Sequence, residues 1–145
     1  MTKNKDHIEV DRKSILTKDG VKTNIMDDFN REIVSVPNII NKNGRSSSWS
    51  HTLVNTESNS ATLIAQIPGE GNRLHFHPDW NEWWYILEGE WEWEIDGTVK
   101  VIRTGDVVFM QKGRKHKITA RGKKMAIRLA VSRADVEHVY PNTVK

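Results

Sequence analysis

The chain of 145 residues contains no cysteine. Disulfide bonds, thiolate metal sites, iron–sulfur clusters and a cysteine nucleophile are therefore excluded. The sequence also has no apolar run near the roughly 20 residues that a membrane helix needs. Its first residues, MTKNKDHIEVDRK, are polar and contain no apolar signal-peptide core. From these absences we expect a cytoplasmic protein with no membrane partner.

Motifs typical of nucleic-acid-binding proteins are missing as well, since there is no helix-turn-helix, zinc finger or aromatic RNA-binding pattern. The net charge is only +3. Basic residues do concentrate between Lys112 and Arg128, a stretch without an acidic residue. Such a stretch can attract an anionic ligand, but a solvated strand and turn explains it more simply. We therefore predict no nucleic-acid partner.

Long helical patterns are absent between Trp49 and Ser132, where short β-type segments alternate with glycine turns. In residues 90–95, Trp or Ile alternates with Glu, which is the two-residue period of a strand with one buried face. The next two residues, Asp96 and Gly97, are typical of a hairpin turn. Many short strands of this kind predict an all-β sandwich or barrel.

The length suits a single domain with one hydrophobic core. We divide the chain into an N-terminal extension (residues 1–48), a β-barrel (residues 49–132) and a C-terminal tail or short helix (residues 133–145). Within the extension, residues 14–20 and residues 33–40 are candidates for short strands.

Two histidines occupy alternate positions in the segment LHFHPDWNEWW, residues 74–84. In an extended chain, His75 and His77 point to the same side. A proline turn then interrupts the strand, and Glu82 follows where a strand resumes. Two imidazoles and one carboxylate are ligands suited to iron, manganese, nickel, copper or zinc. His116, which opens a later strand after a glycine turn, is a candidate fourth ligand.

A divalent metal held by neutral histidines and one carboxylate keeps a net charge of about +1, which favours an anionic substrate or an ionised hydroxyl. The alternative is that these histidines are ordinary surface or hydrogen-bonded residues. Two histidines at alternate positions can arise by chance in a chain that has six. Spacing alone leaves both interpretations open.

A resemblance to a known family favours the metal site. The segment GEGNRLHFHPDWNEWWYILEG, residues 69–89, resembles the first motif of the cupin family. That motif is a glycine, five residues, His-x-His, three or four residues, a glutamate, six residues and a glycine. Every fixed position of the motif is filled here, by Gly69, His75, His77, Glu82 and Gly89.

The second cupin motif is matched less completely, by the segment GDVVFMQKGRKHKITA at residues 105–120. Its two glycines and His116 are present, but Gln111 and Ala120 stand where proline and asparagine are usual. Neither missing residue is a usual metal ligand. The resemblance implies a cupin-type double-stranded β-helix, a small antiparallel barrel, with one divalent metal inside. The implied metal ligands are His75, His77, Glu82 and His116.

Small cupins are commonly homodimers, so the resemblance also implies a homodimer to which the N-terminal extension contributes. Strand alternation from Glu82 places Trp84 inside the barrel and Trp83 and Tyr85 outside it. In a dimeric cupin this outer face is often buried against the partner, which would explain apolar residues on both faces of one strand.

Four further residues are candidates for substrate binding: Arg73, Trp80, Trp84 and Arg128. Arg73 precedes the two histidines by two and four residues, so a continuous strand would point it to their side, where it could hold a carboxylate or phosphate. Trp80 lies on the loop that leads from the histidines to Glu82. The alternative for each is a packed aromatic or a surface arginine, and the pattern does not fix the direction of Arg128.

We interpret the chain as a metal-dependent enzyme that acts on a small polar or anionic molecule. An Fe(II) dioxygenase is the first hypothesis, because an open coordination position can bind substrate oxygen atoms and dioxygen together. The metal could also be Mn, Ni, Zn or Cu. A metal-dependent lyase or isomerase of a sugar, sugar phosphate or small acid is the second hypothesis. A non-catalytic cupin that binds a small ligand is the third, since one fold hosts many functions.

Overall fold

The computed structural model describes residues 9–11, 15–16, 21–133 and 135–141. Within these ranges the chain forms twelve strands and one helix. In chain order they are β1 (Glu9–Asp11), β2 (Asn24–Asp27), α1 (Val36–Asn43), β3 (Trp49–Asn55), β4 (Ser60–Gln66), β5 (Gly71–His75), β6 (Glu82–Glu88), β7 (Glu90–Ile95), β8 (Thr98–Arg103), β9 (Val107–Met110), β10 (His116–Arg121), β11 (Ala126–Ser132) and β12 (His138–Tyr140).

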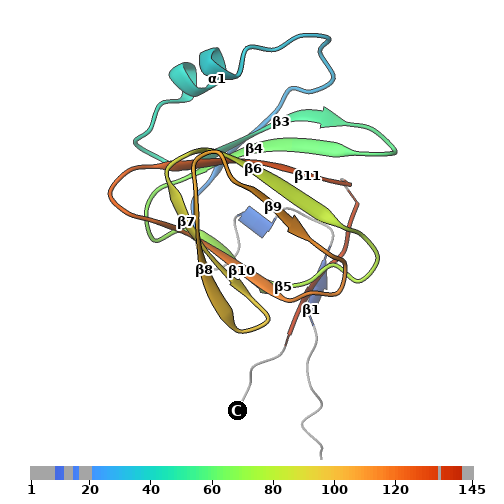
Figure 1. The fold of residues 1–145 in the computed structure, drawn as a ribbon. Coiled ribbons are helices and arrows are strands. Elements are labelled where there is room, and N and C mark those ends of the chain that lie inside the picture. Colours follow the sequence, from blue (N-terminus) through green and yellow to red (C-terminus); the bar gives the residue numbers. More distant parts are fainter. Residues whose placement is uncertain (1–8, 12–14, 17–20, 134, 142–145) are drawn as a thin grey trace, which may run out of the picture.

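Two sheets face each other and enclose the core (Figure 1). The larger sheet has the strand order β2-β3-β4-β11-β6-β9, and the smaller sheet has the order β5-β10-β7-β8. Neighbouring strands are antiparallel except for β2 and β3. This architecture confirms the predicted all-β fold. No helix in the described part of the chain has the length and apolar character needed to cross a membrane.

The inward faces of both sheets supply the core, as the tryptophan–glutamate alternation of β7 illustrates. Trp91 and Trp93 are fully buried, whereas Glu92 between them is exposed. Trp84 and Ile86 of β6 are buried in the same cluster. Burial of a large apolar side chain contributes about 1.5–3 kcal/mol, so a register slip that turned these residues outward would be costly.

The β7–β8 hairpin turns at Asp96 and Gly97, as predicted. Both residues have a positive φ, of 48° and 88°, which is the backbone of a primed two-residue turn. The Asp96 carboxylate accepts hydrogen bonds from Arg114 Nε at 2.9 Å and from the Lys115 backbone N–H at 3.1 Å. The turn therefore anchors the loop that leads into His116.

Helix α1 corrects the strand predicted at residues 33–40. Ser35 caps the helix, because its hydroxyl accepts a hydrogen bond from the backbone N–H three residues later, and Pro37 occupies the first turn. The helix packs on the outer side of the larger sheet through Ile40, and Trp49 Nε1 donates to the Gly44 carbonyl at 2.9 Å. The serine and proline were a helix-start signal that the apolar run obscured.

The other terminal predictions have mixed outcomes. The strand predicted at residues 14–20 lies largely outside the described residues, but Ile15 and Leu16 form a helical turn and are buried. For residues 133–145 the sequence allowed a tail or a short helix. The described part of this segment contains β12, which pairs with β1 in a two-stranded antiparallel sheet.

Candidate metal centre

Strand ends bring the four predicted metal ligands together at one end of the barrel. His75 ends β5, Glu82 begins β6 and His116 begins β10. His116 is directly opposite His75 in the β5–β10 register. His77 follows β5, where the adjacent Phe76 forms a β-bridge with β12. The ring centroids of the three histidines are 4.2–5.4 Å apart.

The backbone sets the orientation of all three imidazole rings. In each ring, Nδ1 lies within hydrogen-bonding distance of a main-chain carbonyl oxygen. The pairs are His75 with Arg73 at 2.7 Å, His77 with Glu137 at 2.9 Å, and His116 with Arg114 at 3.0 Å. A carbonyl oxygen accepts a hydrogen bond, so Nδ1 carries the proton in each ring. Nε2 then keeps a lone pair, as a metal ligand requires.

The buried atoms at the centre fit a cation. His77 Nε2 lies 2.8 Å from Glu82 Oε1. Burial lowers the pKa of His77, but the contact with Glu82 outweighs it and the net pKa is raised. In the described part of the chain the two atoms of this contact and His116 Nε2 are buried without a hydrogen-bond partner. A divalent metal held at this point would contact all three atoms and would take the place of a proton on His77 Nε2.

The pKa values of His75, His116 and Glu82 suit two neutral imidazole ligands and one carboxylate ligand. Burial lowers the pKa of His75 well below its usual value, and the neighbouring histidines add to this shift. Burial likewise lowers the pKa of His116 to about 4. For Glu82, burial raises the pKa, but the contact with His77 outweighs it and the net pKa is lowered. Glu82 is therefore ionised at neutral pH, while His75 and His116 are neutral.

A fifth potential ligand, His138, was missed by the sequence analysis. Two groups of three residues bring their ligand atoms within 4.8 Å of one another: His77, Glu82 and His116 form one group, and His75, His77 and His138 form the other. His138 belongs to β12, which the bridge beside His77 ties to this end of the barrel. Its place well beyond the second cupin motif, which ends at residue 120, left no spacing signal to identify it.

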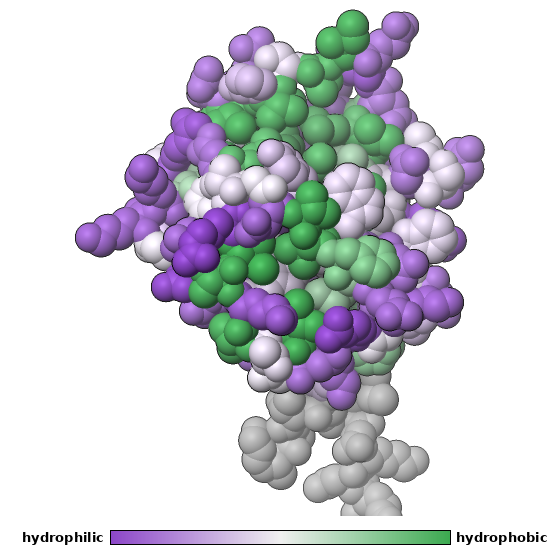
Figure 2. Space-filling model, viewed as in Figure 1, coloured by the Kyte–Doolittle hydropathy of each residue, from purple (hydrophilic) through white to green (hydrophobic). Residues whose placement is uncertain are grey.

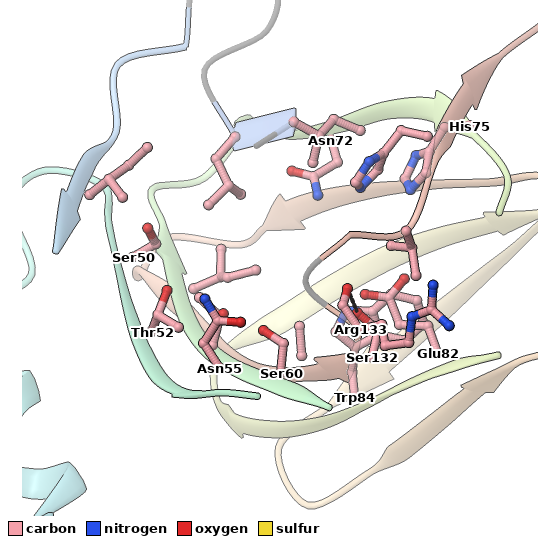
Figure 3. A pocket seen from close by; sticks show the side chains of 18 of the residues that line it. Ser50, Thr52, Asn55, Ser60, Asn72, His75, Glu82, Trp84, Ser132 and Arg133 are labelled. Carbon is pink, nitrogen blue, oxygen red and sulfur yellow. Dashed lines mark hydrogen bonds between the residues drawn. The ribbon is translucent and has the colours of Figure 1, made fainter. Parts of the chain in front are cut away.

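A cavity of about 230 Å³ adjoins the metal centre (Figure 3). His75, Glu82 and His138 contribute to its lining, as does Trp84, one of the predicted substrate-binding residues. The Trp84 ring is 2% exposed and meets Trp93 edge-on at 5.1 Å. Trp84 therefore forms a rigid apolar part of the wall next to the ligands.

Arg128 points into the barrel, where it is completely buried and does not line this cavity. Its Nη1 donates to Gln66 Oε1 at 2.7 Å, and its guanidinium lies 4.4 Å from the Trp91 ring centroid. With the Asn72 amide turned so that its oxygen faces the guanidinium, that oxygen accepts a hydrogen bond from Arg128 Nη2 at 3.1 Å. Burial lowers the pKa of Arg128 to about 9, while Glu82 opposes the shift. Asn72 does line the cavity, so Arg128 contacts a residue of the cavity wall without reaching the cavity itself.

Arg73 occupies a different position from the one that simple alternation predicts. The pairing of β10 with β5 shifts register between His116 and Ile118, which places one extra residue in β5. As a result Asn72 and His75 line the cavity and Arg73 does not. Arg73 instead forms an ion pair with Glu9 at 3.0 Å, and its guanidinium lies over a tyrosine ring of β12 at 4.5 Å.

Trp80 lies beside a second, smaller cavity of about 110 Å³. This cavity is also lined by His77, so it reaches the metal centre from another side. The Arg133 guanidinium stacks over the Trp80 ring at 4.8 Å. The structure thus places Trp80 and Trp84 on different cavities that adjoin the same candidate metal centre.

The ligand geometry and the two-sheet barrel can be compared with known proteins. A comparison with curated protein sequences gives no match. The family model described as "Cupin domain" matches residues 62–132. The chain belongs to the cupin family. The match covers most of the barrel, including every predicted metal ligand, and leaves His138 outside.

Solved structures confirm the double-stranded β-helix fold of this cupin. A conserved protein with a double-stranded β-helix domain from Klebsiella pneumoniae is 21% identical, with a TM-score of 0.60 over 79% of this chain and 88% of the other. A cupin 2 domain-containing protein from Halorhodospira halophila is 20% identical, with a TM-score of 0.61 over 68% and 72%. A predicted oxalate decarboxylase from Thermotoga maritima is 31% identical, with a TM-score of 0.51 over 53% and 67%.

Proposed function

We propose that this cupin binds one divalent metal and uses it to transform a small polar or anionic molecule. The observation that carries the proposal is the convergence of three buried ligand atoms, from His77, Glu82 and His116, within 4.8 Å of one another beside a cavity. His75 is the fourth proposed ligand. The donor set of nitrogen and oxygen suits Fe(II), with Mn, Ni, Zn or Cu as alternatives.

The protein's own contribution to the reaction is to hold and shield the metal. When bound, the metal supplies a Lewis acid for a substrate oxygen and, as Fe(II), a redox partner for dioxygen. The backbone carbonyl oxygens that accept a hydrogen bond from each Nδ1–H keep Nε2 available as the metal ligand. Trp84 and the apolar core behind it exclude water from the inner side of the centre. The ionised Glu82 reduces the charge of the centre to about +1, which leaves attraction for an anionic oxygen.

An Fe(II) dioxygenase is the first candidate reaction. Four protein ligands would leave room for both a substrate oxygen and dioxygen on a metal held there. Oxygen consumption by the Fe(II)-loaded protein, measured across a set of small hydroxylated and aromatic acids, tests this reaction. Turnover without oxygen consumption would contradict it.

A lyase or isomerase that uses the metal only as a Lewis acid is the second candidate, and His138 favours it. If His138 also held the metal, five protein ligands would leave less room than four, which would suit one substrate oxygen without dioxygen. The similarity to the predicted oxalate decarboxylase also supports chemistry of this kind on a small acid. Anaerobic turnover with Mn(II) or Zn(II) is the expected result for this candidate.

Metal binding itself is tested first, by metal analysis of protein purified without chelator and by calorimetric titration with Fe(II), Mn(II), Ni(II) and Zn(II). We expect one metal per chain and a loss of at least tenfold in affinity for His116→Ala and Glu82→Ala. His51→Ala is the matched control, because strand alternation places His51 on the other face of β3. Absence of binding with all four metals would refute the proposed function, including the non-catalytic alternative in its metal-binding form.

A further inference from the structure

We propose that the cavity recognises a small polyhydroxylated molecule, of the sugar or sugar-acid class, through a wall of serine and threonine hydroxyls opposite the metal centre. The inference rests on the proposed function, because it names the substrate class of the same site. The wall consists of Ser50 and Thr52 of β3, Ser60 and Thr62 of β4, and Ser132 of β11, all of which line the cavity. Figure 3 shows Ser50, Thr52 and Ser60 across the cavity from His75.

Strand alternation and register together build this hydroxyl wall. Thr52 is directly opposite Thr62 in the β3–β4 pairing, and Ser60 is opposite Ser132 in the β4–β11 pairing. Leu63, the next residue along β4, points the other way and packs in the second core cluster on the outer side of the sheet, beneath α1. Short hydroxyl side chains therefore replace core residues on one specific patch of the inner face.

The hydroxyls of the wall have unused hydrogen-bonding capacity. In the part of the chain that the structure describes, the side chains of Ser50, Thr52, Ser60 and Thr62 form no hydrogen bond with another residue. Ser50 is only 1% exposed, yet it lines the cavity. An inner face that needed only to be stable would carry aliphatic residues at these positions, as Ile64 does further along β4.

The hydroxyl side chains of the lining suit ligand hydroxyl groups better than charged ligand groups. A hydroxyl both donates and accepts, so a row of them matches a row of ligand hydroxyls without adding charge. The cation of the lining, Arg133, is already paired with Asp135 at 2.7 Å, and the buried Arg128 does not reach the cavity. A ligand held only by ion pairs would find few partners along this wall. An anionic group, as in a sugar acid, is instead accommodated at the metal.

The test uses the full-length protein loaded with Zn(II), which supports no redox turnover. Ligand binding is measured by saturation-transfer-difference NMR and calorimetry with D-glucose, D-galactose, D-xylose, D-glucuronate and D-gluconate, against benzoate and catechol as aromatic comparators. We expect at least one of the sugars or sugar acids to bind and the aromatic comparators to bind more weakly. Thr52→Val and Thr62→Val, which keep side-chain shape, should each weaken that binding by about 5-fold to 10-fold.

Thr98→Val, on exposed β8, is the matched control and should leave binding unchanged. Thermal melting of each variant verifies that it remains folded. If the protein takes up Zn(II) but binds none of the sugars or sugar acids, or binds only the aromatic acids, the hydroxyl-wall inference is overturned while the metal-dependent function stands. Equal affinity in Thr52→Val, Thr62→Val and wild type would overturn it as well. Failure to bind any metal, by contrast, refutes the proposed function itself.

Discussion

Each imidazole ring at the centre is oriented by a main-chain carbonyl oxygen rather than by a side chain. The acceptors for His75 and His116 are the carbonyl oxygens two residues earlier, at Arg73 and Arg114. His77 takes its acceptor from Glu137, near the other end of the chain. Two of the rings are therefore positioned locally, while the third depends on the segment that leads into β12.

His138 should contribute to metal binding, because its ligand atom joins those of His75 and His77 within 4.8 Å. We expect His138→Ala to weaken metal affinity about 10-fold to 100-fold and to reduce the number of coordinated imidazoles on a Cu(II) probe by one. Pulsed electron paramagnetic resonance measures that number directly. An unchanged imidazole count in His138→Ala would show that the metal is held by the family ligands alone, and it would favour the dioxygenase over the lyase or isomerase.

Arg128 is a buried cation whose packing matters more than its charge for stability. Arg128→Ala should lower the free energy of unfolding by roughly 3–5 kcal/mol, because it leaves a cavity against Trp91 and strips Gln66 of its partner. Arg128→Met retains most of the volume and removes the desolvated charge, so it should cost clearly less. Urea unfolding of the three proteins measures the difference. Equal losses for both variants would assign the contribution to the charge instead.

Among the elements, β5 is the one whose position depends most on the absence of a side chain, at Gly71. A Cβ on Gly71 would lie 1.8 Å from the Ile118 carbonyl oxygen, so β5 and β10 approach too closely for any side chain there. The extra residue that shifts the β5 register follows directly, between Asn72 and His75. Gly71 at the start of β5 therefore allows the close strand pairing that places His75 at the candidate metal centre.

Gly71→Ala should destabilise the protein by at least about 2 kcal/mol and weaken metal binding at the same time, because the strand that carries His75 must move. Gly97→Asn is the control: the site has a φ of +88° and open space, and asparagine tolerates that conformation. Chemical unfolding and calorimetric metal titration give the two readouts. A Gly71→Ala protein with native stability and affinity would contradict the close β5–β10 approach.

For the whole molecule, the homodimer implied by the family resemblance remains a prediction. Apolar side chains stay exposed on the outer face of β6 and β9, where Trp83 pairs with Phe109 and Tyr85 pairs with Val107 across the strands. Strand β9 is also an edge of the larger sheet. Figure 2 shows hydrophobic side chains gathered on the face of the molecule where β9 lies in front. Exposed apolar groups of this kind mark contact surfaces.

Sedimentation velocity should therefore give a dimer for the wild-type protein, and Phe109→Lys should shift it to a monomer because a buried, unpaired charge opposes association. Val99→Lys is the control, since Val99 is also exposed and apolar but lies on β8 in the other sheet. A wild-type monomer at every concentration measured would refute the predicted homodimer.

The sequence by itself determined the fold class and the spacing of the four family ligands. Alternation in residues 90–95 fixed which side chains are buried, because the period of a strand is a local property. The helix at Val36–Asn43 was not predicted, because its apolar spacing also fits a short strand and concealed the helix-start signal of Ser35 and Pro37. Local patterns specify what a segment can form, and contacts decide what it does form.

Only the tertiary structure decided which residues complete the site. His138 reaches the centre through a β-bridge between segments more than 60 residues apart, which no local spacing records. One extra residue in β5 replaced Arg73 with Asn72 on the cavity wall. The hydroxyl wall exists because the registers of β3, β4 and β11 align five short side chains on one inner face. Each of these outcomes depends on pairing between distant strands, whereas the metal motif is contained within segments that the sequence shows directly.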